Sequence, residues 1–200
     1  MSNEQSVYML ILATLIGYML GSVPVAVLIS RIRSVNILST GTQLAGAANV
    51  YRNVGAVEGL AVFAGDTAKG ALTIIAAHQL RIEGATMLLP AFAALSGHWW
   101  PVFARFRGGD GLSTVVGITF ALLTIYSLPS MLTGGIVAAI ARGTGHHASL
   151  WGGSAGYGLL LLRSPMSQEN NVMVIGVVVL AIMVLIHAVR GHRRRRSTST

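Results

Sequence analysis

Long apolar runs separated by short polar gaps dominate the chain. A helix that crosses the hydrocarbon core of a bilayer needs about 20 mostly apolar residues. The pattern predicts about seven such spans, at residues 7–30, 56–78, 84–103, 112–128, 130–141, 148–162 and 172–189. Pro129 is expected to separate the fourth from the fifth, because proline interrupts helical hydrogen bonding. The sequence therefore predicts an all-α integral membrane protein that forms a single polytopic domain over residues 1–200.

Composition strengthens the prediction that the chain lies in a membrane. Hydrophobic residues make up 53% of the chain and charged residues only 10%, against about 25% charged in an ordinary soluble domain. Mean hydropathy is +0.67, so much of the apolar surface is expected to meet lipid. Residues 1–6 lack a basic region, and we interpret the first run as a retained span rather than a signal peptide.

The positions of the arginines predict an orientation. If the chain crosses about seven times, eleven arginines fall on one side and only Arg81 and Arg163 on the other. Positive residues concentrate on the cytoplasmic side, so the N-terminus is expected outside and the C-terminus in the cytoplasm. The glycine-rich loops and a basic tail, residues 191–200, then share the cytoplasmic side. The eleven are Arg31, Arg33, Arg52, Arg105, Arg107, Arg142, Arg190 and residues 193–196.

Residues 39–52, which read STGTQLAGAANVYR, form the first candidate site. Small residues let a backbone approach a ligand closely. Backbone N–H groups, the Thr42 hydroxyl and the Arg52 guanidinium together suit a phosphate group. The alternative is a surface loop, interfacial or re-entrant, whose arginine meets lipid headgroups.

Residues 97–111, which read GHWWPVFARFRGGDG, form the second. Its glycines and arginines fit an anion-binding loop beside the first one. The alternative treats Trp99 and Trp100 as anchors at the membrane interface and the arginines as ordinary cytoplasmic charges. His98 is either a satisfied structural histidine or part of the site.

Asp66 and Lys69 lie within the second expected span. Charges at membrane depth are costly and usually pair or serve a function, and a spacing of three places both on one helical face. Either a structural ion pair or a contribution to the site fits this pattern. His187, near the end of the last span, could also face the site. No ligand spacing indicates a metal or another cofactor, and no basic face interleaved with aromatic residues indicates nucleic-acid binding.

Four short motifs in order resemble one family. They are GSVP at residues 21–24, GAANVYR at 46–52, DTAKG at 66–70, and GHWWPVF at 97–103 followed by RFRGG at 105–109. These segments resemble the G-S-[IV]-P, G-A-T-N-V-x-R, D-x-x-K-G and G-H-x-F-P-V-F-x-x-F-x-G-G patterns of the acyl-phosphate-dependent glycerol-3-phosphate acyltransferases of bacteria (PlsY). The resemblance covers nearly the whole chain.

The resemblance implies a multi-pass enzyme of the bacterial inner membrane. Such an enzyme moves a fatty acyl group from acyl phosphate to glycerol 3-phosphate and gives lysophosphatidic acid, with no cofactor and with membrane lipid around it. It implies catalytic roles for Thr42 and His187. Asp110 as a general base for the substrate hydroxyl is a separate hypothesis, which the family pattern does not supply. It implies substrate or phosphate binding by Gly41, Gly46, Asn49, Arg52, Lys69, His98, Arg105, Arg107, Gly108 and Gly109.

The chain departs from the family pattern at several of these places. Asp110 stands where the family has a phosphate-binding lysine, Gln43 and Leu44 replace a glycine and an asparagine, and the asparagine that follows the late histidine has no clear counterpart. Arg105 or Arg107 could replace the lysine. One alternative function is a family member that has lost catalysis and binds a lipid or a partner. A small transporter is another, although only Asp66 and Lys69 sit deep in an expected span.

Overall fold

Helices make up the regular structure of the described residues, which are 3–141, 148–163 and 168–196 of the computed structural model. The longer ones are α1 (Asn3–Gly21), α2 (Val25–Ile32), α4 (Ala56–Gln79), α5 (Leu88–Trp99), α6 (Leu112–Leu122), α7 (Thr124–Ala141), α8 (Ala148–Arg163) and α9 (Gln168–Arg196). The shorter ones are η1 (Ile37–Ser39), α3 (Ala47–Asn53), η2 (Gly84–Met87) and η3 (Val102–Ala104). The prediction of an all-α protein is confirmed. The whole of the expected polar gap at 142–147 and the last four residues of the expected tail lie outside the described residues, and α9 continues into that tail.

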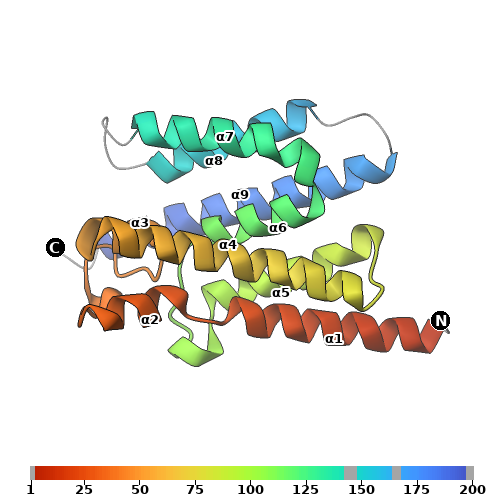
Figure 1. Ribbon diagram of the computed structural model, residues 1–200, viewed down its shortest axis with the longest axis horizontal. Helices are drawn as coiled ribbons and strands as arrows, with labels where there is room; N and C mark the ends of the chain where they lie inside the picture. Colours follow the sequence, from red (N-terminus) through yellow and green to blue (C-terminus); the bar gives the residue numbers. More distant parts are fainter. Residues whose placement is uncertain (1–2, 142–147, 164–167, 197–200) are drawn as a thin grey trace.

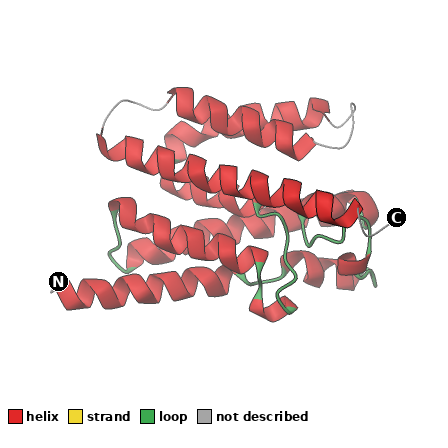
Figure 2. Cartoon of the chain, turned by 180° about the vertical axis from the view of Figure 1, so that it is seen from behind, coloured by secondary structure: helices red, strands yellow, loops and turns green. Residues whose placement is uncertain are grey.

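The long helices run roughly along one axis (Figure 1). The start of α1 and the end of α4 lie at one end of the bundle, whereas α2, α3 and the end of α9 lie at the other. The view from behind shows the same arrangement (Figure 2). Arg31, Arg33 and Arg52 therefore share an end with the last turns of α9, and Arg81, which follows α4, lies at the opposite end.

Three segments of the described chain are long and apolar enough to cross a bilayer: Asn3–Ile32, Ala56–Gln79 and Asn171–Val189. The total of about seven spans stays a prediction. At 1.5 Å per residue, α5 is roughly 18 Å long and α6 roughly 17 Å, while the hydrocarbon core is about 30 Å thick. The irregular segment 100–111 between them therefore lies within the length of the bundle, as the position of η3 in Figure 1 shows.

Prolines explain two boundaries that differ from the expected ones. The first span breaks after Gly21, because Pro24 has no N–H to donate and Val23, which precedes it, is disfavoured in the helical region. In the same way α5 ends at Trp99 rather than at residue 103, because Pro101 follows Trp100.

The prediction that Pro129 ends a helix was wrong. Pro129 lies inside α7, and the break falls at Leu123, whose backbone angles of −132° and 41° leave the helical region. Pro129 is the sixth residue of α7, so the main-chain hydrogen bond that it removes lies near the helix start. The interruption is tolerated there because only one such bond is lost, the one that the Ile125 carbonyl would otherwise accept.

Glycines allow several helices to pack at backbone contact. A Cβ on Gly21 of α1 would lie 2.0 Å from the Ala94 carbonyl of α5. A Cβ on Gly117 of α6 would lie 1.9 Å from the Thr67 carbonyl of α4. Such close packing by small residues is how helices associate in lipid, where burial of apolar surface gives little driving force.

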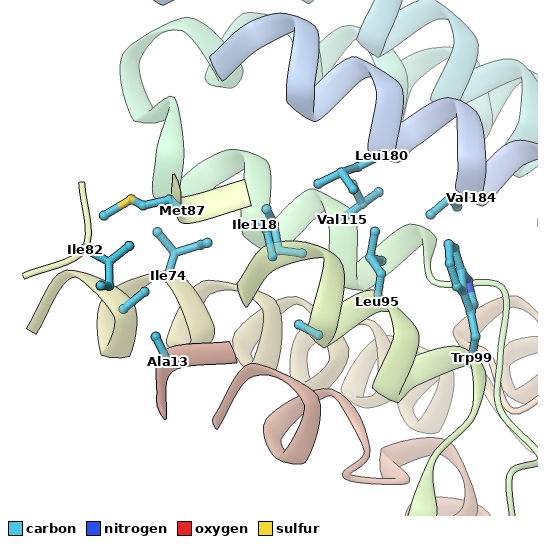
Figure 3. Packing of buried hydrophobic residues seen from close by; sticks show 13 residues of the cluster. Ala13, Ile74, Ile82, Met87, Leu95, Trp99, Val115, Ile118, Leu180 and Val184 are labelled. Atoms are coloured by element: carbon cyan, nitrogen blue, oxygen red, sulfur yellow. The ribbon is translucent and has the colours of Figure 1, made fainter. Parts of the chain in front are cut away.

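The largest buried cluster joins α4, α5, α6 and α9. Figure 3 shows Leu95, Val115 and Ile118 at its centre, with Ile74 nearer to Ile82 and Met87 at one end. Trp99 closes the cluster at one end, beside Val184, and only 5% of its surface is exposed. The cluster therefore fixes the end of α5 against α9, directly before the irregular segment begins.

Candidate active site

A polar pocket opens where the first span is broken. Val23 and Pro24 line it on one side, and the Gly108–Gly109 turn lines it on the other. Its charged and titratable lining groups are Asp66, Lys69, His98 and Arg107. The cavity itself is narrow, with room for about one water molecule. The break in α1–α2 and the short α5 thus bring these groups together within the length of the bundle.

Asp66 and Lys69 form a buried ion pair at the floor of this pocket. The Lys69 ammonium lies 2.8 Å from Asp66 Oδ1, and the two side chains are 6% and 2% exposed. Lys69 also donates to the Val23 carbonyl at 3.1 Å. That carbonyl lies at the break in the first span, so Lys69 ties α4 to the break. Lys69 is the only lysine of the chain.

His98 extends this network from α5. Its Nδ1 lies 3.8 Å from Asp66 Oδ1 and 3.3 Å from the Thr114 hydroxyl. Its Nε2 is buried and has no hydrogen-bond partner among the described residues. A buried ring nitrogen without a partner is costly, and His98 lines the pocket. A ligand atom in the pocket could supply the missing hydrogen bond.

The glycine-rich turn is packed against His98 without space for side chains. A Cβ on Gly108 would lie 1.9 Å from the His98 carbonyl, and a Cβ on Gly109 would lie 2.5 Å from His98 Nε2. The turn is held by main-chain bonds from Gly109 N to the His98 carbonyl at 3.3 Å and from Ala45 N to the Gly108 carbonyl at 3.2 Å. The second of these bonds joins the two loops that the sequence singled out.

Asn49 organises the first loop from within. Its side-chain amide donates to the carbonyls of Thr40 and Leu44, each at 3.0 Å. Its Oδ1 accepts from Thr42 N at 3.0 Å and from Asn53 Nδ2 at 2.9 Å. The side-chain amide of Asn49 is therefore bonded within the loop and to Asn53. Asn49 thus fixes the shape of the loop that carries Thr42.

Gly41 and Gly46 differ in how closely they are packed. Gly41 has a positive φ of 58°, and a Cβ there would lie 2.3 Å from Asn49 Oδ1. Gly46 has extended backbone with φ −138°. The nearest side-chain atom to a Cβ on Gly46 would be Asp110 Oδ1 at 3.9 Å. Only Gly41 is therefore required by the conformation of the loop.

Asp110 and His187 lie beside the pocket and do not line it. The Asp110 carboxylate accepts from Leu112 N at 3.1 Å, at the first turn of α6. A carboxylate in this place stabilises a helix start by accepting from an otherwise unpaired N–H group. His187 stacks on Trp99, with ring centres 4.9 Å apart and planes 17° apart.

The three arginines of the predicted site occupy different positions. Arg107 lines the pocket, and its guanidinium donates to the Leu38 carbonyl at 2.8 Å. Arg105 is exposed and has a left-handed backbone, with φ 53°. Arg52 is exposed on the last turn of α3 and does not line the pocket.

The structure thus gathers part of the predicted set into one pocket. Lys69, His98, Arg107, Gly108 and Gly109 line it together. Gly46, Asp110 and His187 lie in the surrounding shell, while Thr42, Asn49 and Gly41 form the adjoining loop, and Arg52 and Arg105 are exposed at its margin.

Three groups that hold the pocket residues in place were missed by sequence reasoning. They are the Val23 carbonyl, the Thr114 hydroxyl and the Trp99 indole. A proline within an apolar run was the available signal for the first, because it predicts a break with a free carbonyl. Trp99 was considered as an interface anchor, but it is buried and donates to the Asp110 carbonyl at 2.7 Å. Trp100, by contrast, is 50% exposed.

The fold and the pocket together define an integral membrane protein with a polar, partly cationic ligand site enclosed by broken helices. The family profile described as glycerol-3-phosphate acyltransferase matches residues 11–196. The chain belongs to the glycerol-3-phosphate acyltransferase family, as its motifs predicted.

Relatives and solved structures agree with this assignment. The chain is 34% identical over 170 residues to glycerol-3-phosphate acyltransferase of Rubrobacter xylanophilus, and the matched region covers 85% of each chain. It is 42% identical over 123 residues to glycerol-3-phosphate acyltransferase 1 of Dehalococcoides mccartyi, which covers 60% of this chain but only 59% of that relative.

Two crystal structures of PlsY (YgiH), an integral membrane glycerol 3-phosphate acyltransferase, have a similar fold. The glycerol 3-phosphate form has a TM-score of 0.69 at 26% identity, over 96% of this chain and 90% of that one. The lysophosphatidic acid form has a TM-score of 0.68 at 26% identity, over 94% and 90%. The similarity extends over almost the whole chain.

Proposed function

We propose that this chain transfers a fatty acyl group from acyl phosphate to glycerol 3-phosphate and releases lysophosphatidic acid. The observation that carries the proposal is the pocket that brings Lys69, His98 and Arg107 together with the Gly108–Gly109 turn. Membership of the glycerol-3-phosphate acyltransferase family supports it, as do the glycerol 3-phosphate and lysophosphatidic acid forms of PlsY.

The chemistry suits a site of this kind. An acyl phosphate is a mixed anhydride and is already activated, so the enzyme needs no covalent nucleophile of its own. The substrate hydroxyl attacks the acyl carbon, an ester C–O bond forms, and the bond from the acyl carbon to the phosphate oxygen breaks. Inorganic phosphate leaves, and the hydroxyl proton passes to that phosphate, directly or by way of a neighbouring side chain. The protein has to hold two phosphorylated groups, align the hydroxyl with the carbonyl, and stabilise the phosphate as it leaves.

Residues around the pocket supply these contributions in the proposed reaction. Arg107 and the Gly108 N–H contact phosphate, and His98 Nε2 takes the hydrogen bond that it otherwise lacks. Lys69 contributes positive charge from the floor of the pocket. Thr42 and His187 approach from the adjoining loop and from α9, where a hydroxyl and an imidazole can orient the attacking group or move its proton.

The proposed location is a bacterial cell membrane, with the N-terminus outside and the C-terminus in the cytoplasm. The arginine-rich end of the bundle, which carries α2, α3 and the last turns of α9, supports this orientation under the positive-inside rule. Acyl phosphate, glycerol 3-phosphate and membrane lipid are then its partners. The basic segment 191–200 is proposed to lie against anionic headgroups, at about 1 kcal/mol for each basic residue near the surface.

The test measures acyl transfer by the purified full-length protein in lipid vesicles. A long-chain acyl phosphate and labelled glycerol 3-phosphate are supplied, and labelled lysophosphatidic acid is separated and counted. Arg107→Ala is expected to lower kcat/KM about 10- to 100-fold, because a hydrogen bond to a charged group is worth about 1.5–3 kcal/mol. Arg163→Ala is the matched control, since Arg163 is exposed at the last turn of α8 and lines no part of the pocket.

Absence of product from folded wild-type protein would contradict the proposal. It would favour the alternative of a family member that has lost catalysis, which Asp110 and the other motif changes suggested. Restoration of activity by Asp110→Lys would then show that one reversed charge had removed it.

A further inference from the structure

Trp99 connects two parts of the site that are far apart in the sequence. It is the last residue of α5, and its indole N–H donates to the Asp110 carbonyl at 2.7 Å. Asp110 follows the glycine-rich turn directly, so this bond fixes the end of the turn to α5. Trp99 stands at the open position of the G-H-x-F-P pattern, and the family resemblance therefore assigns it no role.

The other contact of Trp99 is with His187 of α9. The two rings are nearly parallel, with planes 17° apart and centres 4.9 Å apart. Trp100 meets the same imidazole edge-on, at 6.1 Å and 90°. Val184, one helical turn before His187, is buried beside Trp99 (Figure 3). The imidazole is thus held by a flat surface on one side and by an edge on another.

We propose that Trp99 is a positioning residue that sets the plane of the His187 imidazole and couples it to the glycine-rich turn. A stacked contact fixes the plane of the ring, and the plane determines where the two ring nitrogens point. The indole cannot rotate away without breaking its bond to the Asp110 carbonyl. One rigid side chain therefore fixes the position of the imidazole on α9 relative to the turn that lines the pocket. This inference rests on the proposed acyltransferase function, in which His187 takes part.

Two substitutions separate the two contacts of Trp99. Trp99→Phe keeps an aromatic face for His187 and removes the N–H, so we expect a higher KM for glycerol 3-phosphate with little change in kcat. Trp99→Leu removes the aromatic face as well, and we expect kcat to fall at least about tenfold, the order of loss that a misplaced group produces. Trp151→Leu is the matched control, because Trp151 is 65% exposed on α8 and contacts neither loop.

The outcomes distinguish the inference from the proposed function. An inactive wild type would contradict the proposed function. An active wild type with unchanged kcat in Trp99→Leu would overturn the inference alone, and so would an equal loss of kcat in Trp99→Phe and Trp99→Leu. Thermal unfolding of each variant is measured in parallel, so that a loss of folding is not taken for a loss of positioning.

A fluorescence measurement tests the stacking without any assay of activity. Trp100→Phe combined with Trp151→Phe leaves Trp99 as the only tryptophan, since the chain has three. A protonated imidazole in contact with an indole quenches its emission, so in acidic buffer, where the imidazole is protonated, adding His187→Ala to this background is expected to increase the emission of Trp99. Unchanged emission would show that the rings are not stacked in the membrane and would overturn the inference, whatever the kinetics of Trp99→Leu.

Discussion

Replacing Lys69 with methionine tests the buried ion pair at the floor of the pocket. The substitution nearly keeps the volume of the side chain but removes its charge, which leaves the Asp66 carboxylate 2% exposed and unpaired. Breaking a buried pair from one side costs about 3–5 kcal/mol. We therefore expect Lys69→Met to lower the free energy of unfolding by that amount, which is a large share of the stability of a typical domain.

The double variant Asp66→Asn/Lys69→Met provides the decisive comparison. It leaves no buried charge, so its cost is mainly the bond from Lys69 to the Val23 carbonyl, which is 3.1 Å long. A hydrogen bond of this charged kind is worth about 1.5–3 kcal/mol. The double variant should therefore be about 2 kcal/mol more stable than Lys69→Met.

Equilibrium unfolding in detergent, followed by circular dichroism, measures both variants and the single Asp66→Asn control. A double variant no more stable than Lys69→Met would refute the reasoning, because the cost would then not come from an unpaired carboxylate. Acyl transfer is measured on the same samples. Restored stability without restored activity would indicate that the Lys69 charge also serves the reaction.

Other substitutions test the loops around the pocket. Gly109→Ala places a Cβ 2.4 Å from the Ala45 carbonyl and is expected to lower activity and thermal stability together, whereas Gly135→Ala, with open space around it, should change neither. Asp110→Ala should destabilise the protein by about 0.5–2 kcal/mol through loss of the bond to Leu112 N. Asp110→Asn, which can still accept that bond, should keep most of the stability in thermal unfolding. Full acyl-transfer activity in Asp110→Asn would exclude Asp110 as a general base. Arg52→Ala should raise the KM for glycerol 3-phosphate about tenfold or more without changing the melting temperature, and an unchanged KM would remove Arg52 from the phosphate site.

The class of fold was predictable because it depends on composition and on the length of apolar runs. The scarcity of charge and the run at 56–78 predicted α4 almost to the residue. The ends of other helices depend on local chemistry that hydropathy does not register. Pro24 breaks an apolar run that reads as continuous, while Pro129 lies near a helix start and leaves α7 intact.

The pocket was predictable in its members and not in their arrangement. The pairing of Asp66 with Lys69 followed from a spacing of three residues on one helix. The approach of His98 to that pair and the stacking of Trp99 on His187 depend on how α4, α5 and α9 pack. Asn49 shows the same limit, because the family resemblance implied a role in substrate or phosphate binding whereas its bonds run to the loop around it.

Irregular backbone at membrane depth is tolerated only where protein covers it or where it lines a polar cavity. Within segment 100–111 the glycine-rich turn meets both conditions, whereas Val102, Phe103 and residues 105–107 are exposed. The glycine-rich turn in this segment bonds to α5 and to the loop at Ala45, and its other face forms the wall of the pocket. The break at Val23 is satisfied in the same way, by the Lys69 ammonium. The interruption between α1 and α2 and the one after α5 thus meet at the pocket where a phosphorylated substrate is proposed to bind, and polar backbone groups at both are bonded to neighbouring segments. The short helices, the prolines and the glycines are consequences of the same requirement, which is to place polar backbone inside an apolar bundle.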